Sequence, residues 1–146
     1  MDDGPARYRS VFISDIHLGT RGCQAELLLD FIRHMDCQSL YLVGDIVDGW
    51  KMKSGLYWPQ SHNDVIQKIL RLARRGVAVT YIPGNHDDLV RDFCGIHFGG
   101  VVVARDAIHQ CADGRRAQDW ARRGVLGQRH SGPKRARTLP VYPAGP

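Results

Sequence analysis

Three short apolar runs, each ending at a polar cluster, are the feature that most constrains the fold of this chain. All three are rich in β-favouring side chains, and each ends abruptly: residues 8–13 at Ser14-Asp15, residues 39–43 at Gly44-Asp45, and residues 77–82 at Pro83-Gly84. The third run, VAVTYI, lacks polar alternation, which is typical of a strand buried on both faces. The pattern predicts three strands of one sheet.

Segments with helical periodicity separate these runs. Residues 24–35 and 61–75 place apolar side chains three and four positions apart, and Gly76 follows the second segment. The order strand, helix, strand, helix, strand predicts parallel β-α-β units of the α/β class. We expect a polar loop at 48–60 and, after the third strand, three further elements: a short helix at 89–93, a strand from Val101 and a turn at Asp113-Gly114.

The polar clusters at the strand ends are the candidate functional residues. Open parallel sheets bind ligands beyond the carboxyl ends of their strands. The clusters found there are Asp15 with His17, Asp45 with Asp48, and Asn85 with His86 and Asp87. Taken singly, each cluster more often marks a turn or a helix cap. Their shared position at three successive strand ends favours a binding site.

These residue types suit a pair of metal ions. Asp15 and His17 are two residues apart and could bring a carboxylate oxygen and an imidazole nitrogen to one ion. Asp45 has two oxygens and could bridge two ions, while Asn85 offers a neutral oxygen to the second ion. His86 is then free for proton chemistry.

The spacing of the clusters resembles that of a known family. The motifs D-x-H at 15–17, G-D-x-x-D at 44–48 and G-N-H-D at 84–87 occur in the order found in the calcineurin-like metallophosphoesterases. The sequence around them is similar to the UDP-2,3-diacylglucosamine diphosphatase-like branch, which is linked to lipid A synthesis in Gram-negative bacteria. The resemblance covers about residues 8–116.

The resemblance implies a fold and a set of ligands. It implies the N-terminal half of an α-β-β-α sandwich over residues 1–116, with two divalent ions, Mn, Fe or Zn, at the strand ends. Asp15 and His17 would bind the first ion, Asp45 would bridge the two, and Asn85 would bind the second.

It also implies a reaction. The ions would activate a water that attacks phosphorus in line and would neutralise the developing charge, so the substrate is a phosphate ester or a nucleotide-linked lipid. His86 would protonate the departing oxygen, and Asp48 or Asp87 would orient the His86 ring.

The family's two later histidine motifs are not found in this chain. From Ala117 onward the sequence is rich in Arg, Pro and Gly with no regular period, so we expect residues 117–146 to be a basic, disordered tail. A shift of reading frame near codon 117 of a GC-rich gene would explain this change, and a genuine tail is the alternative. Resequencing the locus would distinguish the two.

Two consequences follow from the missing motifs. Asp45 and Asn85 alone are too few ligands for tight binding of a second ion, so a catalytically incomplete fragment is one interpretation of the chain. Half a sandwich would also expose an apolar sheet face and an edge, which favours aggregation or a homodimer.

Charge and composition bear on partners and location. Residues 1–116 hold as many acidic as basic residues, so the formal net charge of +5 arises entirely from 117–146. A basic protein that binds nucleic acid through this tail is the alternative function, although the tail lacks interleaved aromatics and nucleic acid is not the expected partner. The absence of a signal peptide and of a long apolar run predicts a cytoplasmic protein, with peripheral contact to the inner membrane.

Overall fold

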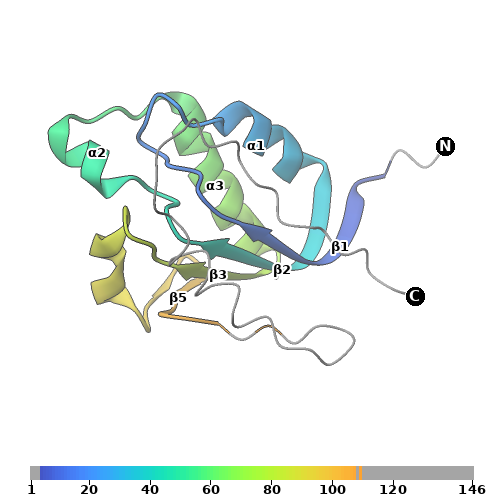
Figure 1. Cartoon of the computed structure of the whole chain (residues 1–146). Coiled ribbons are helices and arrows are strands. Elements are labelled where there is room, and N and C mark those ends of the chain that lie inside the picture. Colours follow the sequence, from blue (N-terminus) through green and yellow to red (C-terminus); the bar gives the residue numbers. More distant parts are fainter. Residues whose placement is uncertain (1–3, 108, 110–146) are drawn as a thin grey trace.

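The structure, a computed structural model, describes residues 4–107 and 109. These residues form one five-stranded sheet in the order β1-β2-β3-β5-β4, with helices packed on one face of it (Figure 1). The expected α/β class is therefore confirmed, with one helical layer and one sheet of the expected sandwich in the described residues. The turn predicted at Asp113-Gly114 and the tail predicted over 117–146 lie outside them.

The sheet is parallel except at one edge. Strands β1 (Ala6–Ile13), β2 (Met35–Val43), β3 (Ala78–Ile82) and β5 (Val101–Val103) are parallel neighbours in the order given, and the two-residue β4 (His97–Phe98) pairs antiparallel with β5. Because β1, β2 and β3 are parallel, their carboxyl ends lie along one edge of the sheet.

Helices α1 (Ala25–Arg33) and α3 (Gln60–Arg74) pack side by side on one face of the sheet (Figure 1). Each buries one stripe at helical spacing; the stripe of α3 is formed by His62, Val65, Ile69 and Leu72. Beneath them lies a register row with one buried residue from each parallel strand: Val11, Leu40, Val79 and Val101. This row and the two helices form the core.

The opposite face of the sheet carries an aromatic cluster. Phe12 and Tyr41 are register partners whose rings stack with centroids 4.7 Å apart, and the His109 ring lies edge-on to both. The Tyr41 hydroxyl also lies 3.3 Å from Nδ1 of His109. Phe12 and Tyr41 belong to a row of the sheet next to the buried row of Val11 and Leu40, so their side chains point to the face that the helices do not cover.

Two predicted boundaries were wrong around residue 35. The helix predicted over 24–35 ends at Arg33, and β2 begins at Met35 rather than at Ser39. Met35 fits the helical period, but it is buried as the first residue of a strand in which Asp36 is exposed and Cys37 is buried. Buried and exposed residues alternate at the start of β2, but Gln38 and Ser39 are both polar, so the sequence does not show this alternation clearly.

The loop predicted at 48–60 contains a short helix, α2 (Gly49–Ser54). Asp48 caps it, because its Oδ1 accepts a hydrogen bond from the Lys51 amide at 2.9 Å. The short helix predicted at 89–93 is the 3-10 helix η1 (Asp88–Phe93). Strand β1 begins at Ala6, two residues before its predicted start, whereas the boundaries of α3 and β3 fall within one residue of the prediction.

Candidate metal centre

The loops after β1, β2 and β3 are joined into one structure by backbone hydrogen bonds. The amide of Asp15 donates to Gly44 O at 3.1 Å, and the amide of His17 donates to Asp45 O at 2.9 Å. The third loop joins through the Gly49 amide, which donates to His86 O at 2.8 Å. Backbone contacts of this kind hold the three polar clusters in fixed relative positions.

Three predicted ligands adopt an unusual backbone conformation. Asp15, His17 and Asp45 have φ angles of 55°, 53° and 54°, and in the described part of the chain they are the only residues other than glycine with positive φ. A left-handed backbone costs free energy for residues that carry a Cβ. Such strain persists where the surrounding structure imposes it, and it concentrates at functional sites.

The same three side chains converge. One ligand atom from each of Asp15, His17 and Asp45 lies within 4.8 Å of the others, and His17 Nε2 is 3.6 Å from Asp15 Oδ1. The Asp15 carboxylate raises the pKa of His17 above 6.5, burial opposes that shift, and Asp48 adds to it. The site therefore carries a surplus of negative potential, which favours a bound cation.

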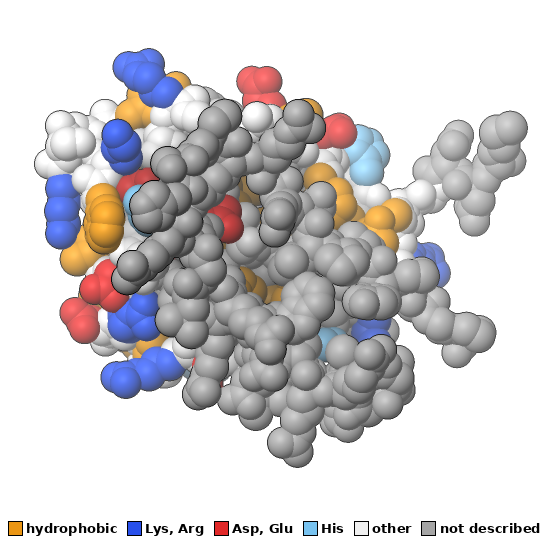
Figure 2. Space-filling view, in the orientation of Figure 1, with side chains coloured by type: hydrophobic (Ala, Val, Ile, Leu, Met, Phe, Trp, Pro, Cys, Tyr) orange, Lys and Arg blue, Asp and Glu red, His pale blue; other side chains and the backbone are white. Residues whose placement is uncertain are grey.

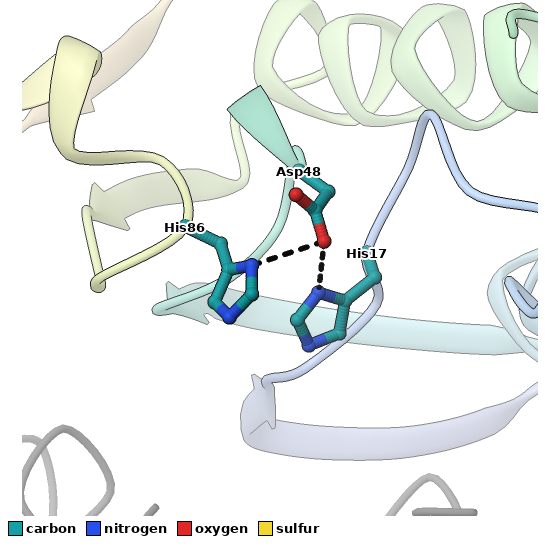
Figure 3. Close-up of side chains that lie close together, drawn as sticks. All are labelled: His17, Asp48 and His86. Carbon is teal, nitrogen blue, oxygen red and sulfur yellow. Dashed lines mark hydrogen bonds and ion pairs between the residues drawn. The ribbon is translucent and has the colours of Figure 1, made fainter. Parts of the chain in front are cut away.

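Asp48 holds two histidine rings. Its Oδ2 lies 3.0 Å from His17 Nδ1 and 3.1 Å from His86 Nδ1, and the other nitrogen of each ring points away from Asp48 (Figure 3). A carboxylate on one ring nitrogen fixes the ring and makes the other nitrogen a better metal ligand or proton carrier. The contact with His86 places Asp48 where the orienting partner of His86 was predicted.

Asp48 remains a carboxylate in this position. Burial alone would raise its pKa, because its side chain is 4% exposed, but the Lys51 amide and the rings of His17 and His86 outweigh burial and lower the pKa. Among the described residues, no Lys or Arg forms an ion pair with Asp45, Asp48 or Asp87. These negative charges are therefore balanced by amides and histidines.

Asp87, the other predicted partner of His86, binds the loops instead. Its carboxylate accepts the amides of Asp45 at 3.2 Å and of Ile46 at 2.9 Å, and it also accepts the Gly84 amide and the Tyr81 hydroxyl. The Asp87 side chain is almost fully buried. Its contacts fix the loops after β2 and β3 to each other, which is a positioning role.

Asp45 forms hydrogen bonds with two residues of the loop after β3, His86 and Asp87. Its amide donates to Asp87, and its Oδ1 accepts the His86 amide at 2.9 Å. Gly84 lies so close that a Cβ at this position would be 2.7 Å from Asp45 Oδ1. Among the described residues, the other carboxylate oxygen of Asp45, Oδ2, forms no side-chain hydrogen bond.

A cleft of about 160 Å³ opens beside His86. The Trp50 ring lies over the His86 ring with centroids 4.5 Å apart, and Asn85 is exposed at the same edge of the sheet. Figure 2 shows basic and apolar side chains on the part of the surface where α2 and η1 lie. The remaining residues that line the cleft are Lys53, Asp88, Leu89, Arg91 and Asp92.

Tyr81, which donates to Asp87, and His62 also contact the site loops, and the sequence pointed to neither of them. His62, in the first turn of α3, is 2% exposed, and its Nδ1 accepts the Gly19 amide at 2.9 Å. The signal was a histidine on the apolar stripe of the predicted helix, a pattern that more often marks an ordinary core residue.

A family model described as calcineurin-like phosphoesterase matches residues 8–128 of this chain. The chain belongs to the calcineurin-like phosphoesterase family. The residues that bear the family's motifs are those that the structure brings together at the ends of β1, β2 and β3. The donor set of carboxylate oxygens and imidazole nitrogen suits a divalent first-row ion.

Relatives within the calcineurin-like phosphoesterases include UDP-2,3-diacylglucosamine hydrolases. The protein of that name from Neisseria gonorrhoeae is 37% identical over 90 residues, which cover 58% of this chain and 37% of the relative. The one from Xanthomonas campestris pv. campestris is 38% identical over 85 residues, covering 56% of this chain and 33% of the relative. The match thus spans about a third of the length of these relatives.

Among solved structures, one nuclease is similar to part of this chain. The Pseudomonas putida nuclease MPE superimposes with a TM-score of 0.41 at 19% identity, covering 67% of this chain and 48% of the nuclease.

The described part of the chain contains no helix that is long and apolar enough to cross a bilayer.

Proposed function

We propose that this chain is a metal-dependent hydrolase of a phosphate ester or pyrophosphate, and that the residues at the ends of β1, β2 and β3 form its catalytic centre. The proposed substrate is a nucleotide-linked lipid of the UDP-2,3-diacylglucosamine type, which the names of the most similar relatives support. The observation that carries the proposal is the convergence of three strained, acidic or imidazole residues on one point.

In this proposal Asp15, His17 and Asp45 hold the first divalent ion, with Mn, Fe or Zn as candidates. Asp45 would also be shared with a second ion, and Asn85 would supply that ion with a neutral amide oxygen. When bound, the two ions supply a Lewis acid that lowers the pKa of water and neutralises charge on phosphorus.

In this proposal, residues of the chain orient the metal ligands and supply the proton for the leaving group. Asp48 orients His17 so that Nε2 faces the carboxylates of Asp15 and Asp45. Oδ2 of Asp48 also lies 3.1 Å from His86 Nδ1 as an ion-pair contact, and the other ring nitrogen, Nε2, would be the one that gives a proton to the departing oxygen. The Trp50 ring is tilted against the His86 ring and, with it, borders the cleft into which the leaving group would extend.

Hydrolysis of bis-p-nitrophenyl phosphate by the purified chain with Mn²⁺ tests the proposal. We expect p-nitrophenol release that requires Mn²⁺ and that falls by at least about a hundredfold in Asp45→Ala, because the bridging ligand is lost. The matched control is Asp36→Ala, an exposed aspartate at the opposite end of the same strand.

Either of two results would contradict the proposal. Equal Mn²⁺-dependent release by Asp45→Ala would place the chemistry elsewhere. No release from soluble, monodisperse wild-type chain would show that the polypeptide is a catalytically incomplete fragment, the alternative raised by its sequence. Membrane contact and a homodimer remain predictions.

A further inference from the structure

We propose that His62 is a positioning residue for the metal centre, acting through its Nδ1 on the loop that carries His17. This inference rests on the proposed function for its relevance to catalysis, but its structural part stands on its own contacts. His62 belongs to α3, which supplies none of the predicted ligands.

The loop after β1 is held from two sides. On one side Leu18 pairs with the loop after β2: its amide donates to Ile46 O at 2.8 Å, and its carbonyl accepts the Asp48 amide at 2.8 Å. On the other side the next residue, Gly19, donates its amide to His62 Nδ1 at 2.9 Å. His62 therefore fixes the backbone two residues beyond His17.

The Gly19 amide has a demanding geometry. Gly19 has a φ of 98°, and a Cβ there would lie 3.1 Å from Met52 of α2, so the chain turns sharply in a confined space. A buried amide without an acceptor destabilises the fold. His62 Nδ1 supplies the acceptor that makes this turn stable.

His62 is held in the form that accepts this bond. Nδ1 must be unprotonated because it accepts the amide, so the structure assigns the ring proton to Nε2. Burial lowers the pKa of His62, and its place in the first turn of α3 also disfavours an imidazolium. The rings of Tyr57 and Trp58 meet His62 edge-on, with centroids 5.8 and 5.6 Å away, which fixes the plane of the imidazole.

Tyr57, one of these two aromatic residues, also contacts Arg21, further along the loop after β1. The guanidinium of Arg21 lies 4.5 Å from the centroid of the Tyr57 ring, a cation–π contact. The His17 loop is thus anchored at Gly19 by His62 and at Arg21 by a neighbour of His62. Both anchors come from residues 57–62, which lie outside the three family motifs.

Two substitutions separate positioning from folding. His62→Leu removes the acceptor, whereas His62→Asn keeps an oxygen near the position of Nδ1. In isothermal titration of the full chain with Mn²⁺, we expect His62→Leu to weaken binding by about ten- to a hundredfold, as for other residues that orient ligands. His62→Asn should restore affinity to within about threefold of the wild-type chain.

Val65→Ala is the matched control. Val65 is fully buried one turn further along α3 and has no contact with Gly19 among the hydrogen bonds of the described residues. It should lower the free energy of unfolding and leave Mn²⁺ affinity within about threefold of wild type. Amide exchange of Gly19, followed by NMR, should accelerate at least about tenfold in His62→Leu and not in Val65→Ala.

The possible outcomes are distinct. Unchanged Mn²⁺ affinity and unchanged Gly19 exchange in His62→Leu would overturn the proposal, as would His62→Asn binding no better than His62→Leu. Neither readout needs turnover, so a chain that lacks phosphoesterase activity can still confirm or overturn the role of His62.

Discussion

At the scale of single residues, the site is built by carboxylates that do different work in similar positions. Asp45 lies where an ion would be held, Asp48 orients two histidines, and Asp87 accepts three amides and a hydroxyl. Their sequence contexts are similar, because Asp45 and Asp48 follow Gly44 and Asp87 follows Gly84, each within four residues. The structure distinguishes them by what each oxygen contacts.

Asp87→Asn should destabilise the chain. Each Asp87 oxygen accepts two hydrogen bonds, so an amide group in place of either oxygen would meet at least one donor that cannot pair. We expect a loss of about 2–3 kcal/mol in the free energy of unfolding, measured by urea denaturation. Asp88→Asn, at the exposed next position, should cost under about 1 kcal/mol, and equal losses in both variants would contradict this role.

The sequence was sufficient to predict that Asp15, His17 and Asp45 lie close together, but not what each candidate residue contacts. Asp15, His17 and Asp45 were predictable because parallel strands bring their carboxyl ends to one edge. The different roles of Asp48 and Asp87 were not, because they depend on which backbone amides face each oxygen. His62 was missed because its partner is the Gly19 amide, and a backbone amide leaves no mark in the sequence.

At the scale of elements, the geometry of the site depends on the loops after β2 and β3 lying unusually close together. The Asp45 amide is within 2.8 Å of the place where a Cβ on Gly84 would stand. Only glycine permits this approach, and the reason is space rather than conformational freedom. The periodicity of the sequence predicted the strands themselves, but it could not predict this closeness between their loops.

Gly84→Ala should separate these two loops and weaken the metal centre. The added methyl group would meet Asp45 Oδ1 and the Gly44 Cα, both under 3.0 Å away, so the backbone must shift. We expect a loss of about 1–3 kcal/mol in the free energy of unfolding and weaker Mn²⁺ binding. Gly22→Ala, where nothing lies within 4 Å, is the control, and wild-type Mn²⁺ affinity in Gly84→Ala would contradict the account.

At the scale of the whole molecule, one helix-covered sheet positions all the candidate residues along a single edge. The core formed by α1, α3 and the buried strand row supports this edge, while the opposite face presents Phe12 and Tyr41. The chain spans about a third of the length of its curated relatives. The central claim of our proposal is that the three motifs at this edge bind a divalent cation.

Titration of the full chain with Mn²⁺ by isothermal calorimetry tests this claim most directly. The account predicts saturable binding that weakens at least about tenfold in Asp45→Asn, because one ligand charge is lost, and that is unchanged in Asp36→Asn at the other end of β2. Binding that is equally strong in the wild-type chain and in Asp45→Asn, or no saturable binding by the wild-type chain, would contradict it.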